Sequence, residues 1–185
     1  MRRDVKVLFA LAVAFLSGTA QAQARGFINP WGGVIFGNDA AVTGFHSYGV
    51  TFGNASHSIW STETTVGYSP RFFGSSVDNY VLDLTAGVVI GPTLRAKARH
   101  EIRPYGLAGV GTVRTSIDSG AAALKRNDIG LSFGGGAAID VNDRLAVRGD
   151  VRYFRALGSD AAANTLGADL ANFNYWRAAI GVLIH

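Results

Sequence analysis

The stretch Leu145-Ala146-Val147-Arg148-Gly149-Asp150-Val151-Arg152-Tyr153-Phe154 decides how the fold of this chain is interpreted. Its odd positions, from Leu145 to Tyr153, are apolar or glycine, whereas Arg148, Asp150 and Arg152 occupy even positions. A period of two residues places successive side chains on opposite faces of a β-strand. The segment therefore predicts a strand with one apolar face and one charged face.

Seven further segments are predicted as strands, four with clear alternation and three that are less regular, and nothing after residue 25 keeps a helical period. In 129–139 the second face is narrow, because it is built of Gly, Ser and Ala. The adjacent glycines Gly32 and Gly33 leave one register open, as it also is for 47–53 and 102–114. The predicted strands are 27–36, 47–53, 60–68, 80–90, 102–114, 129–139, 145–154 and 175–184.

The first 24 residues have the pattern of a secretory signal peptide. A positively charged start precedes an apolar run over 7–16, which is too short to span a bilayer as a helix of about 20 residues. Small residues at alternate positions predict cleavage after Ala22 or Ala24. We therefore expect a signal peptide over 1–24, followed by a single domain over 25–185.

Composition narrows the class of protein. The chain has 17 basic and 13 acidic residues and a net charge of +4, of which +2 remains without Arg2, Arg3, Asp4 and Lys6. So small an excess gives no support for nucleic-acid binding. An exported chain without cysteine also has no disulfides or thiolate metal sites, so its stability must come from backbone hydrogen bonds and packing.

The apolar faces of these strands are expected to face lipid, and the charged faces an enclosed lumen. Only 26 charged residues follow residue 24, and Lys97 and Lys125 are the only lysines among them, which is little for a water-facing coat. An arginine facing lipid at the midplane would cost about 2–4 kcal/mol. The charged side chains expected inside the lumen are Glu63, Asp83, Arg148, Asp150, Arg152 and Arg177.

Aromatic residues are expected at strand ends, where amphipathic rings lie at the level of the lipid headgroups. These predicted interfacial residues are Trp31, Trp60, Tyr68, Tyr80, Tyr105, Tyr153 and Trp176. Connection lengths are unequal: 141–143 is a tight turn, whereas 115–127 and 158–172 are long. With both termini periplasmic, the loops near 38–46, 69–78, 115–127 and 158–172 would face outward, and Arg95, Lys97 and Arg99 would be periplasmic.

Several phrases resemble the outer-membrane β-barrel domain family of OmpA-like and OmpX-like small barrels. They are Arg103-Pro104-Tyr105-Gly106-Leu107-Ala108-Gly109-Val110-Gly111, Phe133-Gly134-Gly135-Gly136-Ala137, Asn142-Asp143-Arg144-Leu145 and Tyr68-Ser69-Pro70-Arg71-Phe72-Phe73. The resemblance implies an all-β, eight-stranded antiparallel up-and-down transmembrane barrel in the cell outer membrane, inserted by the outer-membrane assembly machinery. Chains of this family usually end in an aromatic residue, whereas this one ends in His185.

Three function classes follow from these features. The first is a structural or interaction protein whose lumen is plugged by ion pairs and whose outer loops contact an extracellular partner. The second is a narrow channel for small solutes. The third is a lipid A-modifying enzyme, which the pairs His46-Ser47 and His57-Ser58 disfavour, because neighbouring strand residues point to opposite faces.

No cofactor or metal is expected, and no residue is assigned a catalytic role. Asp39, Asp78 and Asp118 could bridge cations to lipopolysaccharide, but no spacing among them resembles a dedicated metal site. The expected partners are outer-membrane lipid and lipopolysaccharide, the assembly machinery, and an unknown extracellular partner reached through the loops.

Overall fold

The computed structural model describes residues 25–37, 45–55, 59–74, 78–92, 94–95, 101–118, 123–157 and 174–185. The predicted signal peptide over 1–24 lies outside these residues, as do Lys97, Arg99 and the predicted outer loop 158–172. No helix in the described part of the chain is long and apolar enough to cross a membrane.

The described residues form eight long strands and one short strand. The bounds are β1 Arg25–Phe36, β2 Phe45–Ala55, β3 Trp60–Pro70, β4 Asp78–Ile90, β5 Leu94–Arg95, β6 Glu101–Asp118, β7 Ala123–Asn142, β8 Leu145–Leu157 and β9 Asn174–Ile184. Each long strand contains one of the eight predicted strands. β5 only extends the sheet beside the start of β6, where Leu94 pairs with Ile102.

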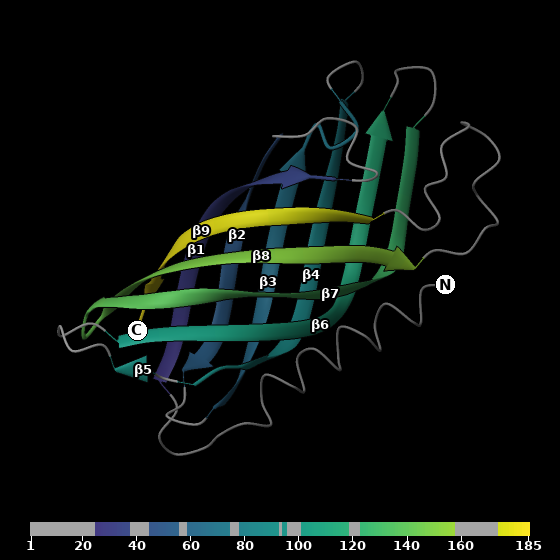
Figure 1. The fold of residues 1–185 in the computed structure, drawn as a ribbon. Helices are drawn as coiled ribbons and strands as arrows, with labels where there is room; N and C mark the ends of the chain where they lie inside the picture. The colour runs from purple at the N-terminus through teal and green to yellow at the C-terminus, as the bar shows by residue number, and fades with distance from the viewer. Residues whose placement is uncertain are drawn as a thin grey trace.

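The eight long strands close into an antiparallel barrel. Neighbours follow the order β4-β3-β2-β1-β9-β8-β7-β6, and the pairing of β4 with β6 joins the two edges. In Figure 1 the strands curl around one axis, with β7, β8 and β9 crossing in front of β1 to β4. The predicted fold class, an eight-stranded antiparallel barrel, is confirmed.

The two ends of this barrel differ in the connections they carry. Because neighbouring strands alternate in direction, β1, β3, β6 and β8 end, and β2, β4, β7 and β9 begin, at one end of the barrel, which we call the loop end. The turn Asp143-Arg144 between β7 and β8 lies at the other end, together with the starts of β1 and β6 and the end of β9. We call this second end the terminal end.

Side chains follow the predicted alternation, with apolar residues outside and polar residues inside. Phe133 and Ile180 are 52% and 64% exposed on the outer face. In contrast, Thr51 and Arg177 are at most 1% exposed on the inner face. This is the reverse of a water-soluble barrel, in which the outer surface must be polar.

One predicted loop is wrong. Residues 115–127 are mostly strand, since β6 continues to Asp118 and β7 begins at Ala123. β6 and β7 have 18 and 20 residues, more than the 9–11 or so that cross a bilayer as a strand. The parts of β6 and β7 at the loop end therefore need no apolar face. Their polar sequence lacks the alternation that is typical of a membrane strand.

Adjacent glycines in β1 offer a matched test of the barrel wall. A methyl group at Gly33, on the inner face, would collide with the backbone oxygen of Ala178, whereas nothing lies within 4 Å of one at Gly32. We expect Gly33→Ala to lower the free energy of unfolding by about 1–3 kcal/mol, the usual cost of overpacking. Gly32→Ala should leave it unchanged.

Urea unfolding, followed by the faster migration of unboiled protein in detergent gels, measures this difference. Equal midpoints for Gly33→Ala and Gly32→Ala would contradict the wall geometry, and a single band for boiled and unboiled protein would contradict a closed barrel.

Candidate functional site

The lumen holds the six charged side chains that the sequence placed there. Glu63 is 6% exposed, Asp83 2%, Arg148 4%, Arg152 3% and Arg177 1%, and the side chain of Asp150 is 7% exposed. Three of them are acidic and three are basic, so the set carries no net formal charge. They form two groups at different heights in the barrel.

The first group links β3 to β8 through a closed cycle of ion pairs. Arg148 and Arg152 each reach Glu63 through Nη1, at 2.8 Å from Oε2 and 2.9 Å from Oε1, respectively. Asp150 lies between them on β8, with Oδ1 at 2.8 Å from Arg152 Nε and Oδ2 at 3.4 Å from Arg148 Nε. Each arginine thus contacts both acids, and the buried charges of this group compensate one another.

Tyr105 extends this cycle to β6. Its hydroxyl accepts a hydrogen bond from Arg148 Nε at 2.6 Å and donates one to Asp150 Oδ2 at 3.1 Å. The prediction that Tyr105 lies at a membrane interface is therefore wrong. The sequence had left the register of 102–114 open. The Tyr105 hydroxyl forms stronger hydrogen bonds in the lumen than with water, because both of its partners, Arg148 and Asp150, are charged.

The second group links β9 to β4. Arg177 Nη1 lies 2.7 Å from Asp83 Oδ1. The guanidinium group of Arg177 is also sandwiched between two rings, with Cζ 4.1 Å from the ring centroid of Trp31 and 4.4 Å from that of Phe154. Trp31, only 7% exposed, is thus a lumen residue, and its predicted interfacial position is wrong.

Both groups cross the full width of the barrel. In the closed order of strands, β3 is four places from β8, and β4 is four places from β9. Each pair of strands therefore occupies opposite walls of an eight-stranded barrel. The ion pairs tie together walls that share no backbone hydrogen bonds.

An apolar cluster lies at the loop end of the lumen. The rings of Phe154 and Tyr175 stack with centroids 4.9 Å apart, and Phe72 packs edge-on against Tyr175 at 4.8 Å. The whole cluster consists of Ile35, Phe72, Val81, Val113, Phe154, Ala156 and Tyr175. The sequence pattern does not indicate this cluster, because Phe154 is an apolar residue on the same face of its strand as Arg148, Asp150 and Arg152.

The turn between β3 and β4 holds Phe72 in this cluster. Arg71 and Gly74 adopt φ values of +54° and +102°. The side chain of Asn79 clamps the turn, since Oδ1 accepts a hydrogen bond from Phe73 N and Nδ2 donates one to Gly74 O, both at 2.8 Å. Phe72 is therefore fixed over the lumen and fully buried.

The remaining predicted aromatic residues lie on the outer face. Trp60 is exposed near the terminal end, and towards the loop end the rings of Tyr68 and Tyr80 lie 5.5 Å apart. The rings of Tyr153 and Trp176 lie 5.1 Å apart. Two residues that the sequence analysis missed extend these groups, Tyr48 beside Tyr68 and Phe133 beside Tyr153.

The other residues weighed from the sequence form no common site in the described part of the chain. His46 is exposed on the outer face, while Ser47 points inward and accepts a hydrogen bond from Ser69 Oγ at 2.9 Å. Asp78 and Asp118 are exposed partners in the β4–β6 ladder. Asp39, His57 and Ser58 lie outside the described residues, within which no three His, Cys, Asp or Glu side chains are grouped for a metal ion.

The Asp83–Arg177 pair provides a test of how much the crossing ion pairs stabilise the barrel. Asp83→Asn leaves a buried guanidinium group without its anion, so we expect the free energy of unfolding to fall by about 3–5 kcal/mol. The added substitution Arg177→Met should recover part of this loss, because it removes the unpaired charge. Urea unfolding of the folded barrel in detergent measures both changes.

The matched control is Asp140→Asn. Asp140 pairs with Arg103 on the neighbouring strand at 2.6 Å, and these side chains are 23% and 26% exposed. Removing a pair that water reaches should cost about 1 kcal/mol or less. An equal loss for Asp83→Asn and Asp140→Asn would show that crossing the lumen adds nothing.

Comparisons with known proteins agree with this architecture. Neisserial surface protein A has a crystal structure with a TM-score of 0.66 at 14% identity, covering 87% of this chain and 97% of that one. The crystal structure of a major outer membrane protein from Thermus thermophilus has a TM-score of 0.50 at 10% identity, covering 86% of this chain and 98% of that one.

Ail, the attachment invasion locus protein of Yersinia pestis, has a TM-score of 0.48 at 15% identity, over 86% of this chain and 97% of that one. No curated protein matches the chain. A family model described as the outer membrane protein beta-barrel domain matches residues 8–177. The chain therefore belongs to the outer membrane β-barrel domain family.

Proposed function

We propose that this outer-membrane barrel is a closed anchor whose loop end is the surface for contacts with partners, and whose lumen does not conduct. The observation that carries the proposal is the pair of ion-pair groups crossing the lumen between opposite walls. An eight-stranded barrel is just wide enough for side chains to fill. Arginine side chains that reach the far wall leave little room for a solute.

Within the network, the space between Glu63 and Arg152 is small. A cavity next to Glu63, Thr65 and Arg152 has a volume of about 10 Å³, about enough for one water molecule. Above Arg177, the cluster around Phe72 and Tyr175 adds an apolar barrier at the loop end. A charge-balanced middle under an apolar lid supports a plug rather than a path for ions.

The proposed partners lie at the two surfaces that the barrel offers. The outer face contacts lipid, and exposed basic residues near the loop end, Arg114, Lys125 and Arg155, suit the phosphate groups of lipopolysaccharide. The proposal includes insertion by the outer-membrane assembly machinery and an extracellular protein partner at the loops. It assigns the chain no catalytic role.

Planar bilayers test the plug directly. The purified, heat-modifiable barrel should give no stable single-channel steps, because Arg148 and Arg152 fill the lumen together with Glu63. Removing both arginine side chains, as in the double variant Arg148→Ala/Arg152→Ala, should open small steps. Arg114→Ala, on the outer face, is the control and should stay silent.

Stable steps in the wild-type barrel would overturn the plug and favour the narrow channel. The link to the lumen would be secure if the size or ion selectivity of those steps changed in Arg148→Ala and not in Arg114→Ala.

A further inference from the structure

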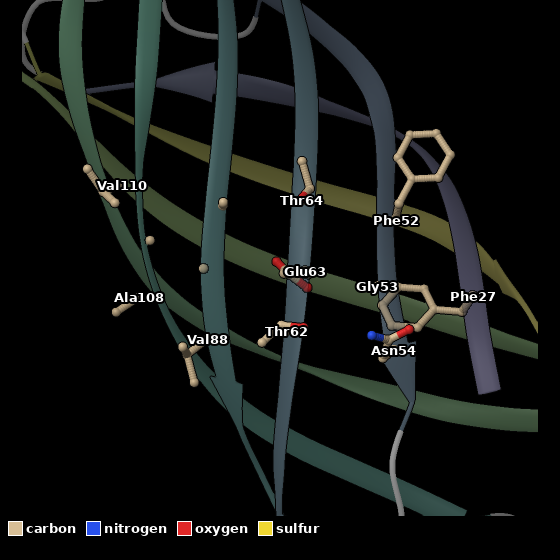
Figure 2. Close-up of a pocket in the computed structure, with 13 residues that line it drawn as sticks. Phe27, Phe52, Gly53, Asn54, Thr62, Glu63, Thr64, Val88, Ala108 and Val110 are labelled. Carbon is tan, nitrogen blue, oxygen red and sulfur yellow. The ribbon is translucent and has the colours of Figure 1, made fainter. Parts of the chain in front are cut away.

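The barrel wall is hollowed where β2, β3, β4 and β6 lie side by side. The hollow has a volume of about 570 Å³, within the range of pockets that bind small ligands. Figure 2 shows its lining, with Phe52 on one side, Thr62 and Thr64 in the middle, and Val110 on the other.

Outward-facing residues of low volume form the floor of the hollow. Alternation puts Thr62, Thr64, Ala86 and Ala108 on the outer face, on three neighbouring strands. Among the described residues of the lining, Glu63 is the only charged one, and its carboxylate is paired with arginines in the lumen. The floor is therefore uncharged and, apart from the two threonine hydroxyl groups, apolar.

The hollow lies between the two levels of aromatic residues on the outer face. Along β3, Thr62 and Thr64 follow Trp60, which is exposed near the terminal end, and precede Tyr68, which contacts Tyr48 and Tyr80. Aromatic rings on membrane barrels mark the two interfaces, so the residues between them face hydrocarbon. The hollow therefore faces the acyl chains of the membrane lipids.

We propose that the hollow binds one acyl chain of a membrane phospholipid. An apolar cavity of about 150 Å³ is enough to bind benzene. The hollow is more than three times larger, and Phe52 and Val110, which line its two sides, are 44% and 48% exposed on the outer face. Thr62 lies two residues from Trp60, so the headgroup would lie at the terminal end.

This inference rests on the membrane position of the barrel and not on a closed lumen. Its failure and that of the plug are therefore distinguishable, because bilayer conductance does not depend on a lipid that is retained outside.

The test is native mass spectrometry of the full protein purified from outer membranes in mild detergent. We expect a population that carries one phospholipid. Ala86→Leu, which fills the floor of the hollow, should lower that bound fraction at least about tenfold, which corresponds to about 1.4 kcal/mol of lost binding. Heat-modifiable migration confirms that the variant is folded.

The matched control is Ala178→Leu, which adds the same side chain to the outer face of β9, away from the hollow. It should keep the wild-type fraction of bound lipid. Equal fractions in the two variants would overturn the inference, as would a retained lipopolysaccharide or a second copy of the chain in place of the phospholipid. Loading with a defined phosphatidylethanolamine should restore the bound form in wild type and Ala178→Leu only.

Discussion

The pairing of β4 with β6 is the constraint on which the rest of the molecule depends. It leaves the long strands without a free edge between Asp78 and Ile90, where an unpaired backbone group in hydrocarbon would cost several kcal/mol. Closure then divides the side chains into an outer set that faces lipid and an inner set whose members contact only one another. The polarity of the two faces follows from that division.

The inner set must balance its own charge. A charged side chain in the lumen has little water, so an arginine there is tolerated only with an acid in contact. Glu63 serves two arginines at once, while Asp83 serves Arg177 between two aromatic rings. Because these partners come from opposite walls, the same contacts that neutralise the charges also fix the cross-section of the barrel.

Much of this could be predicted from the sequence, since a membrane strand must keep an apolar stripe. The alternation in 145–154 placed Arg148 and Arg152 inside, and all eight long strands were located. The alternation of the sequence does not predict which charged residues pair, because partners such as Arg177 and Asp83 are 94 residues apart. The positions predicted for Tyr105 and Trp31 were wrong because an aromatic ring is favourable both at a membrane interface and next to a cation. The ends of β6 and β7 were predicted as a loop because their polar sequence has no alternating apolar residues.

One row of inner-face residues lies in the same stretch of the barrel wall as the hollow on the outer face. Gly53, Glu63, Gly87 and Gly109 are successive partners across β2, β3, β4 and β6, so Glu63 is the only large side chain in this part of the inner wall. At Gly53 the ring of Phe27 occupies the space that a Cβ atom would need. The outward neighbours of this row include Thr62, Thr64, Ala86 and Ala108, which form the floor of the hollow. The glycines that flank Glu63 on the inner face thus lie on the same stretch of the barrel wall as the hollow on its outer face.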